Sequence, residues 1–338
     1  MVNNKKAFIT GITGQDGSYL AEFLLDKGYT VAGLARRNAV SELGNVSKIR
    51  EEIKIYYGDL QSPESVALAL VEFKPDEIYN LASMSSPFAS FSDRVGSIMI
   101  TGVGAMNVFE RAKQIVPDAK IYQASTSEMF GAPKTIPQNE ETPFNPANPY
   151  AAAKEFAHRM AVISRKDKKQ SQFIACGILF NHESPRRGLN FVTRKISAGV
   201  ACIKNGKKEG VPLNEMGDPI VRDGKLTLGD LDAKRDWGYA PDYVEAMWMM
   251  LQQEKADDFV VATGEEHSVE EFAREAFAVV GLDWKDYVVT NSDFVPPVQT
   301  GPLLGDSAKA KKILGWEAKT KFKELVTIMV HSDLAKFS

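Results

Sequence analysis

Cysteine and histidine are scarce in this chain of 338 residues, which has two cysteines and four histidines. Cys176 and Cys202 lie far apart and have no partner at metal-ligand spacing, so neither a disulfide framework nor a zinc site is predicted. The histidines are scattered as well, which favours surface or hydrogen-bonded core positions over metal ligation. We therefore expect no bound metal and a reducing, cytoplasmic environment.

Long apolar runs and an excess of one charge are also lacking. No stretch approaches the length of a membrane span, and the first residues, Met1–Lys6, do not resemble a secretion signal. The net charge of −3 gives no basic footprint for nucleic acid. Apolar residues at 44% and charged residues at 25% are typical of a globular protein. The expected partners are therefore neither membranes nor nucleic acids.

Short apolar runs alternate with helical patterns in the first half of the chain. This alternation predicts an α/β fold, a Rossmann-type doubly wound sheet of parallel strands. The predicted strands are Ala7–Thr10, Thr30–Ala35, Ile53–Tyr57, Glu77–Leu81, Lys120–Ala124 and Phe173–Ile178. The predicted helices between them are Ser18–Lys27, Pro63–Phe73, Ser97–Gln114 and Tyr150–Ser164.

The regular alternation ends near Leu179. We expect residues 1–179 to form the nucleotide-binding domain and residues 180–338 mainly a smaller α/β lobe for substrate, with some segments returning to the first domain. Ser268 and Glu271 form a capping box before a helix that Gly281 ends, and a shorter helix is predicted between Asp306 and Gly315. The Gly206–Leu226 segment is expected to be a long loop or an added hairpin.

A glycine-rich turn joins the first predicted strand to the first predicted helix. Gly11, Gly14 and Gly17 allow a tight turn and a close approach of the backbone to a pyrophosphate, and the helix that follows presents its amino end. Thr13, Gln15 and Asp16 lie in the same turn. The pattern favours dinucleotide binding over the alternative, a plain strand–helix turn.

Two arginines, Arg36 and Arg37, follow the second predicted strand, where an acidic residue would bind the ribose 2′-hydroxyl of NAD. Guanidinium groups suit a 2′-phosphate, so the expected cofactor is NADP. The alternative is that one or both arginines form surface or subunit salt bridges. Further positions expected to contact the cofactor follow the third and fourth strands, and these are Asp59, Leu60, Leu81, Ser83 and Ser85.

Tyr150 and Lys154 are spaced to lie on one face of a helix that Asn148 and Pro149 begin. A nearby ammonium and a cationic nicotinamide ring would favour the phenolate form of Tyr150. The phenolate would take a proton from a secondary alcohol while a hydride leaves the same carbon. The pair is common on helix surfaces, but together with the glycine turn it predicts alcohol oxidation.

The fifth predicted strand ends in Thr126 and Glu128, at the edge of the sheet where open α/β folds bind ligands. Thr126 is placed to donate a hydrogen bond to an oxygen that becomes a ketone. Glu128 adds a second acid/base, which removal of water requires and simple alcohol oxidation does not. The alternative is a polar cluster that caps the next segment.

These motifs together resemble those of the GDP-mannose 4,6-dehydratases, within the extended short-chain dehydrogenase/reductase family. The resemblance covers nearly the whole chain, and its most specific motif is N-H-E-S-P-R-R-G at Asn181–Gly188. It also rests on Gly11–Leu25, Ser125–Glu128, Pro149–Lys154, Leu231–Gly238 and Ala262–Val269.

The resemblance implies a role for each matching position. Thr126, Glu128 and Tyr150 fall on catalytic positions, with Lys154, His182 and Arg187 on positions that contact NADP. The implied reaction oxidises C4 of the sugar, removes water across C5 and C6, and gives a 4-keto-6-deoxy sugar. The residues expected on the nucleotide-sugar side are Ser85, Thr126, Glu128, Asn181, Thr193, Lys195 and Arg235.

Departures from the family pattern gather on the substrate side. Met84 and Ser86 stand where polar residues are expected, and the 295–299 stretch lacks an arginine and a glutamate. Asp230 replaces an expected asparagine, and the Gly206–Leu226 segment is longer. The residues expected to carry out the reaction are therefore retained, whereas those expected to select the sugar and the base are not. A close GDP-sugar analogue of GDP-mannose is thus an alternative substrate.

Other functions, of two classes, stay open at this point. The same framework resembles nucleotide-sugar C4 dehydrogenases, epimerases and decarboxylases, and a non-catalytic NADP-binding sensor is an alternative of a different class. The resemblance also implies a homodimer or homotetramer. The amphipathic helices Ser97–Gln114 and Tyr150–Ser164 are the expected contact, and the alternative is that their apolar faces belong to the core.

Overall fold

The computed structural model describes residues 5–36, 44–214, 216–295, 298 and 300–338. Within this part of the chain the largest sheet has seven strands in the order β11-β6-β5-β4-β1-β2-β3, and all its pairs are parallel. The predicted α/β fold with a doubly wound parallel sheet is confirmed. The strands are β1 (Lys6–Thr10), β2 (Thr30–Ala35), β3 (Ile53–Tyr57), β4 (Glu77–Asn80), β5 (Lys120–Thr126), β6 (Ile174–Leu179) and β11 (Asp258–Val261).

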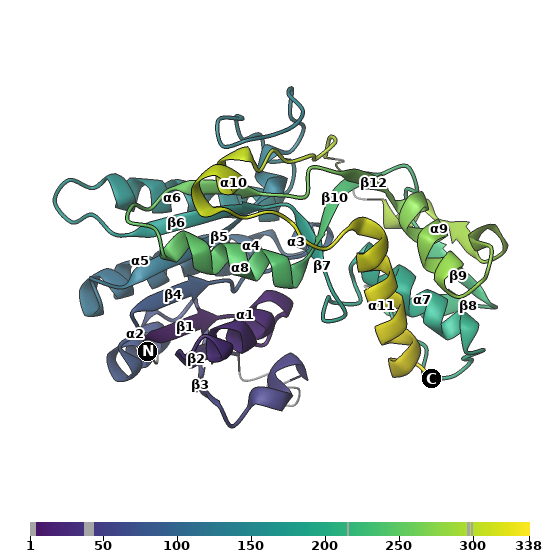
Figure 1. Cartoon of the computed structure of the whole chain (residues 1–338), viewed down its shortest axis with the longest axis horizontal. Coiled ribbons are helices and arrows are strands. Elements are labelled where there is room, and N and C mark those ends of the chain that lie inside the picture. The colour runs from purple at the N-terminus through teal and green to yellow at the C-terminus, as the bar shows by residue number, and fades with distance from the viewer. Residues whose placement is uncertain (1–4, 37–43, 215, 296–297, 299) are drawn as a thin grey trace.

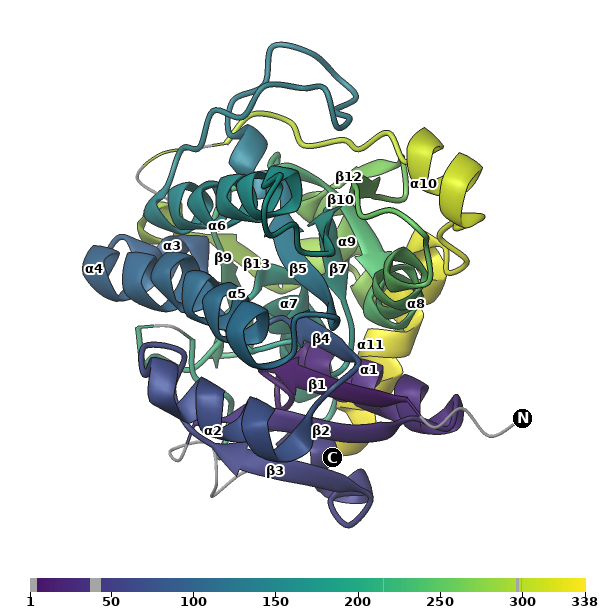
Figure 2. The same cartoon turned by 90° about the vertical axis from the view of Figure 1, so that its left-hand side faces the viewer.

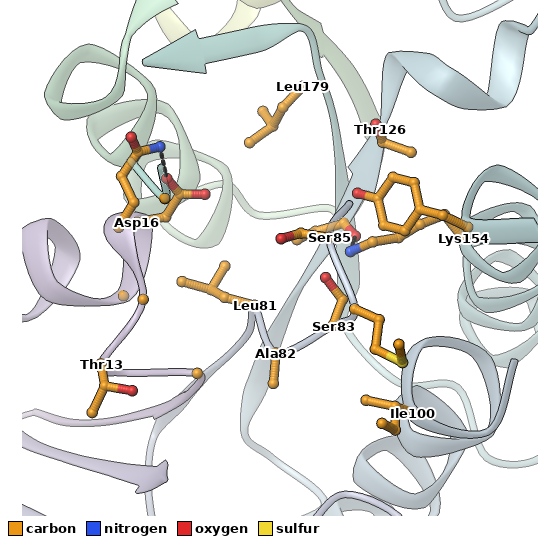
Figure 3. Close-up of a pocket in the computed structure, with 18 of the residues that line it drawn as sticks. Thr13, Asp16, Leu81, Ala82, Ser83, Ser85, Ile100, Thr126, Lys154 and Leu179 are labelled. Atoms are coloured by element: carbon orange, nitrogen blue, oxygen red, sulfur yellow. Dashed lines mark hydrogen bonds between the residues drawn. The ribbon is translucent and has the colours of Figure 1, made fainter. Parts of the chain in front are cut away.

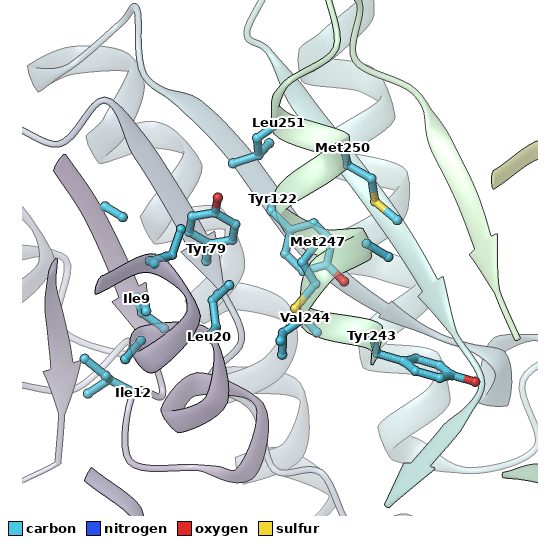
Figure 4. Packing of buried hydrophobic residues seen from close by; sticks show 14 of the residues in the cluster. Ile9, Ile12, Leu20, Tyr79, Tyr122, Tyr243, Val244, Met247, Met250 and Leu251 are labelled. Carbon is cyan, nitrogen blue, oxygen red and sulfur yellow. The ribbon is translucent and has the colours of Figure 1, made fainter. Parts of the chain in front are cut away.

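Helices cover both faces of this sheet, as Figure 2 shows. One face carries α2 (Pro63–Phe73), α5 (Gly104–Ile115) and α6 (Pro149–Lys166), and the other carries α1 (Gln15–Asp26) and α8 (Ala240–Leu251). Apolar side chains fill the space between sheet and helices because each strand reads as a nearly continuous apolar run. Figure 4 shows Leu20 of α1 and Met247 of α8 among the buried residues over Ile9 and Tyr122.

The predicted helix Ser97–Gln114 is divided in the structure. The short helix α4 (Arg94–Ser97) leads into a π-helical segment, Ile98–Val103, and only then into α5. Close packing accounts for the glycines here: a Cβ atom on Gly102 would lie 3.1 Å from the ring of Phe156, and one on Gly104 would lie 2.8 Å from Leu60. Neighbouring elements thus approach the backbone more closely than a regular helix with side chains would allow.

A second group of elements packs beside the carboxyl edge of the sheet (Figure 1). Its helices α7 (Val192–Lys204), α9 (Val269–Val279) and α11 (Phe322–Lys336) share one apolar core. The capping box of Ser268 and Glu271 is present at the start of α9, as predicted. Two three-stranded sheets complete this lobe, one with the order β12-β10-β7 and one with the order β13-β9-β8. Their strands are β7 (Asn181–Glu183), β10 (Lys234–Tyr239), β12 (Glu266–Ser268), β8 (Val221–Arg222), β9 (Lys225–Leu228) and β13 (Val288–Thr290).

The Gly206–Leu226 segment ends in a hairpin, the second of the two predicted alternatives. Strands β8 and β9 pair antiparallel, and Asp223 and Gly224 turn between them at φ values of 51° and 72°. Helix α10 (Ala308–Leu314) ends at Gly315 with a φ of 73°, in agreement with the predicted stop signal. The remaining short helix is α3 (Pro87–Ser90).

Asp236 joins the chain segments around the carboxyl edge. Its fully buried carboxylate accepts hydrogen bonds from the backbone amides of Thr263, Gly264 and Gly305 at 2.9, 3.0 and 3.3 Å. The hydroxyl of Thr263 donates another at 2.6 Å. Strand β10, the segment after β11 and the approach to α10 are therefore fixed to one another.

The division at residues 179 and 180 stays a prediction. From the second half of the chain, β11 is an edge strand of the large sheet and α8 packs against that sheet. None of the helices in the described residues combines the length and the apolar composition of a membrane span.

Candidate active site

One cavity of about 540 Å³ opens at the carboxyl ends of the parallel strands. Figure 3 shows Thr13 and Asp16 on one side of it, Thr126 and Lys154 on the other, and the segment after β4 with Leu81, Ser83 and Ser85 between them. The structure thus brings together residues from both ends of the first half of the chain. The predicted site residues that line it are Gly11, Thr13, Gly14, Gln15, Asp16, Gly17, Arg36, Asp59, Leu60, Leu81, Ser83, Ser85, Thr126, Glu128, Tyr150, Lys154, Asn181, His182 and Arg187.

The glycine turn has the backbone shape that its sequence predicts. Gly11 has a φ of +72°, and a Cβ atom on Gly17 would lie 2.3 Å from the carbonyl oxygen of Gly11. Helix α1 begins after Gly14, and no side chain of the described residues caps its amino end. The exposed amides and the positive end of the helix dipole fit a pyrophosphate.

The end of β2 presents Arg36 to the same cavity, while Arg37 lies outside the described residues. Asn45 also lines the cavity and donates a hydrogen bond to the carbonyl oxygen of Thr13 at 3.2 Å. Asn45 is a residue that the sequence did not reveal, because its contact with Thr13 spans 32 positions. These groups fit the ribose end of a dinucleotide with a 2′-phosphate.

Asp16 and His182 form an ion pair across the cavity wall. The Nε2 atom of His182 lies 2.9 Å from the Asp16 carboxylate, and the Nδ1 atom lies 2.7 Å from the carbonyl oxygen of Phe180. Because both ring nitrogens face acceptors, the geometry suits the doubly protonated imidazolium. Burial lowers the pKa of His182, but Asp16 outweighs it and the pKa is raised. Burial likewise opposes ionisation of Asp16, yet His182 and Gln15 lower its pKa to about 2.

The two arginines of the Asn181–Gly188 motif have different contacts. Arg187 lies 3.2 Å from Glu183 and stacks over Phe191, with 3.5 Å between the guanidinium carbon and the ring centroid. Arg186 binds both oxygens of Glu22 at 2.7 and 2.9 Å, so it ties the motif to α1. The resemblance placed only Arg187 in the site, but both arginines line the cavity.

Helix α6 places Tyr150 and Lys154 on the opposite wall. The Nζ atom of Lys154 donates a hydrogen bond of 2.7 Å to the carbonyl oxygen of Ala124, and burial lowers the pKa of Lys154 to about 8. Burial also raises the pKa of the Tyr150 phenol, against the opposing effect of its hydrogen bond with Thr126. The phenol is therefore protonated in the free protein, and the expected shift towards phenolate needs a further positive charge in the cavity.

Thr126 and Glu128 lie where β5 passes into a short 3₁₀ segment, Ser127–Phe130. Both side chains are buried, and the Thr126 hydroxyl accepts a hydrogen bond from the Glu128 amide at 3.3 Å. This backbone contact is the capping role that the sequence left open. The Glu128 carboxylate itself accepts a hydrogen bond of 3.0 Å from the side-chain amide of Asn148.

A buried polar group lies behind the site. His158, Cys176 and Asp258 each place one possible metal-ligand atom within 4.8 Å of the others. Arg165 already binds both Asp258 oxygens at 3.0 and 2.9 Å. Its positive charge would repel a metal ion at this place, so the group does not suit metal binding. Burial lowers the pKa of His158 to about 4, so the ring is a neutral partner for Ser125, 2.9 Å away.

Three predicted substrate residues lie outside the cavity lining. Thr193 donates a hydrogen bond of 2.6 Å to Glu183, the carboxylate that also contacts Arg187. Lys195 lies over the ring of Phe294, 5.1 Å from its centroid. Arg235 donates hydrogen bonds to Thr300 and to the carbonyl oxygen of Lys234. All three residues belong to the lobe that borders the cavity, but none is seen to line it.

The glycine turn, the Tyr-x-x-x-Lys pair and the parallel sheet together define a short-chain dehydrogenase/reductase. The solved structure of RMD from Pseudomonas aeruginosa, complexed with NADPH, has the same fold: the TM-score is 0.80 at 20% identity, with 98% of this chain and 100% of that chain covered.

Comparison of sequences defines the family more closely. The family model described as GDP-mannose 4,6 dehydratase matches residues 8–329. GDP-mannose 4,6 dehydratase 2 of Arabidopsis thaliana is 46% identical, covering 98% of this chain and 87% of the relative. GDP-mannose 4,6 dehydratase of Homo sapiens is 43% identical, covering 97% and 91%. The chain belongs to the GDP-mannose 4,6-dehydratase family, which confirms the resemblance found in the sequence.

The ion pair of Asp16 and His182 predicts a defined dependence of stability on pH. The contribution of Asp16 is present above its unfolded pKa near 3.8 and is lost as the pH falls towards about 2. The contribution of His182 is present below its unfolded pKa near 6.5 and is lost as the pH rises through the raised folded pKa. We expect Asp16→Asn to lower the free energy of unfolding most between these two unfolded values, measured by urea denaturation across pH.

Nuclear magnetic resonance titration of the histidine rings provides a direct check. The His182 signal, assigned by its absence from His182→Gln, should titrate above the usual histidine range and move to lower pH in Asp16→Asn. An unchanged titration midpoint for His182 in Asp16→Asn would contradict the ion pair.

Proposed function

We propose that the protein is an NADP-dependent nucleotide-sugar 4,6-dehydratase that acts on GDP-mannose or a close GDP-sugar analogue. The observation that carries the proposal is the position of Glu128, buried beside Thr126 and Tyr150 in the wall of one cavity. A second acid/base at this place serves loss of water, which alcohol oxidation alone does not need. Family membership supports both the substrate class and the reaction.

The residues around the cavity suit NADP. The uncapped amino end of α1 and the glycine turn would hold the pyrophosphate, and Arg36 would hold the 2′-phosphate. His182, which pairs with Asp16 of α1, and Arg187 add positive groups to the cavity lining. When bound, NADP supplies a hydride acceptor for C4 and later the hydride donor for C6.

The protein side chains then divide the proton transfers. Tyr150 removes the proton of the C4 hydroxyl, while Thr126 donates a hydrogen bond to the same oxygen. Glu128 removes the proton from C5, which the C4 ketone has made acidic, and delivers it to the C6 hydroxyl as water leaves. Tyr150 returns its proton to C5 when C6 is reduced. Every proton that leaves the sugar thus returns to the sugar or departs in water.

The substrate lobe supplies the groups for the nucleotide. Asn181 lines the cavity, and Thr193, Lys195 and Arg235 belong to the segments beside it. Cationic side chains of this kind suit a diphosphate. Met84 also lines the cavity, whereas the Ser86 hydroxyl caps α3 by accepting a hydrogen bond from Ala89. Met84 brings an apolar thioether to the cavity where a polar side chain is expected. This difference is the reason to include GDP-sugars other than GDP-mannose.

The cytoplasmic location is part of the proposal. It is supported by the chemistry of Cys176 and Cys202, both of which are buried free thiols.

The reaction is tested with purified protein, NADP and GDP-mannose. We expect a GDP-linked 4-keto-6-deoxy sugar by mass and no net reduced cofactor. Glu128→Gln should lower product formation at least about 100-fold and leave C4 oxidation detectable as reduced nicotinamide, whereas Tyr150→Phe should suppress both. Glu155→Gln is the matched control, because Glu155 pairs with Arg159 on the outer side of the same helix.

Other products would identify the alternative functions. A C4 epimer or net accumulation of NADPH would replace the dehydratase by an epimerase or a dehydrogenase. Carbon dioxide released from a GDP-linked uronate would indicate a decarboxylase. Tight NADP binding without turnover of any nucleotide sugar would support the sensor.

Cofactor choice is tested at Arg36. We expect Arg36→Ala to weaken NADP binding by about 10- to 100-fold, the value of a charge-assisted contact with phosphate, and to change NAD binding little. Isothermal titration calorimetry with both dinucleotides measures this difference, and Arg50→Ala, outside the cavity, is the control. Equal losses for the two dinucleotides would contradict the 2′-phosphate contact.

We also propose that two copies associate through α4, the π-helical segment and α6. Large apolar side chains are exposed along these neighbouring elements, with Val95 at 72%, Ile98 at 48% and Ile163 at 58%. A patch of this kind on a globular protein marks an interface. The assembly is a homodimer or a homotetramer built on this contact.

A charge placed in this patch should dissociate the contact. We expect Phe156→Asp to reduce the mass measured by size-exclusion chromatography with light scattering to that of a smaller assembly. Ile313→Asp is the matched control, because Ile313 on α10 is exposed to 46% and Phe156 to 45%. An unchanged mass for Phe156→Asp, or an equal loss for both variants, would exclude this interface.

A further inference from the structure

Asn148 contacts both Glu128 and the start of helix α6, which carries Tyr150 and Lys154. Its side-chain oxygen accepts a hydrogen bond of 2.8 Å from the backbone amide of Ala151, which caps helix α6. Its side-chain nitrogen donates a hydrogen bond of 3.0 Å to the Oε2 atom of Glu128. The residue itself is buried, with an exposed fraction of 8%.

The two contacts fix the orientation of the Asn148 amide. The Ala151 amide can only donate, so it must face the side-chain oxygen of Asn148. The side-chain nitrogen, which can only donate, then necessarily faces the Glu128 carboxylate. A flipped amide would oppose two donors at one end and two acceptors at the other, in a buried place where unsatisfied polar groups are costly.

Glu128 in turn has few other constraints. In the part of the chain that the structure describes, Asn148 is the one side chain seen to donate a hydrogen bond to the Glu128 carboxylate, which borders the cavity. A donor on Oε2 fixes the plane of the carboxylate. The other oxygen, Oε1, is then the atom available to a ligand.

We propose that Asn148 is a positioning residue that holds the Glu128 carboxylate in a fixed orientation and couples it to the helix of Tyr150 and Lys154. The proposal rests on the dehydratase function, since it assigns Asn148 to the step in which Glu128 removes the C5 proton. Its two roles are separable: the cap needs only an acceptor at position 148, whereas Glu128 needs a donor.

Substitutions at 148 separate the two roles. Serine and aspartate both supply a good cap acceptor, so helix α6 keeps its amino end in Asn148→Ser and Asn148→Asp. Serine loses the amide donor to Glu128, and aspartate places a second carboxylate against it. Asn148→Ala removes both contacts. Ser268→Ala, which removes the cap of α9 in the other lobe, is the control for loss of a cap alone.

The first measurement needs no turnover. In protein with isotope-labelled glutamate, the Glu128 carboxyl signal, assigned by Glu128→Gln, is titrated by nuclear magnetic resonance. We expect its midpoint to move to higher pH in Asn148→Ser, and by at least about one unit in Asn148→Asp, where a like charge opposes ionisation. Midpoints that stay at the wild-type value in both variants would overturn the proposal, whether or not the protein is a dehydratase.

The second measurement divides the reaction into its steps. In a single turnover with GDP-mannose, Asn148→Ser should oxidise C4 at nearly the wild-type rate but slow water loss about 10-fold, so that reduced nicotinamide accumulates. The acid limb of kcat/KM should move to higher pH in the same order as the carboxyl signal. Ser268→Ala should lower the unfolding temperature without changing either quantity.

The outcomes distinguish the two proposals. A wild-type protein that forms no 4-keto-6-deoxy sugar defeats the dehydratase function, while the titration still decides whether Asn148 controls Glu128. An active wild type whose Asn148→Ser variant shows neither accumulation nor a shifted acid limb defeats the positioning role alone. Oxidation and water loss slowed by the same factor would also defeat it, because that result describes a general structural fault.

Discussion

The hydrogen bond from Lys154 to the carbonyl oxygen of Ala124 is the contact on which the site depends. It joins helix α6, which carries Tyr150, to strand β5, which ends in Thr126 and leads directly to Glu128. An ammonium buried to this extent needs an acceptor, so a carbonyl near the end of a strand holds it in place. Since Tyr150 lies one helical turn before Lys154, the phenol is directed to the carboxyl edge where Thr126 ends the strand. The catalytic group is therefore a property of sheet and helix packing, not of a loop.

The rest of the cavity is closed by contacts between distant parts of the chain. His182 reaches Asp16 in the first helix, and Arg186 reaches Glu22 in the same helix. Away from the cavity lining, Asp236 accepts hydrogen bonds from the amides of Thr263, Gly264 and Gly305. The glycine turn and the substrate lobe are thus held by charged and polar pairs, which require specific geometry, whereas the sheet beneath them is held by apolar burial. This division keeps the cavity wall polar without weakening the core.

Local signals explain why much of the fold was predictable. The strands Thr30–Ala35 and Ile53–Tyr57 and the helix Pro63–Phe73 have the predicted bounds, because apolar periodicity and a proline start act within a few residues. The π-helical segment Ile98–Val103 was missed because it depends on packing around Gly102 and Gly104. In the site, the glycine turn and the Tyr150–Lys154 pair are local, but the contact of Asp16 with His182 spans 166 positions. Asn148 was recognised as a cap, yet its second contact with Glu128 exists only once β5 and α6 have met.

Strand β11 is made long after strand β6, its partner in the sheet. Strand β6, with every residue buried, pairs with β5 on one side and with β11 on the other, and β11 comes from residues 258–261. While the chain is being made, β6 is an apolar edge with open amide and carbonyl groups until those residues leave the ribosome. A chain that stopped short of β11 would therefore not yield a small nucleotide-binding protein. It would expose a template for strand addition and tend to aggregate.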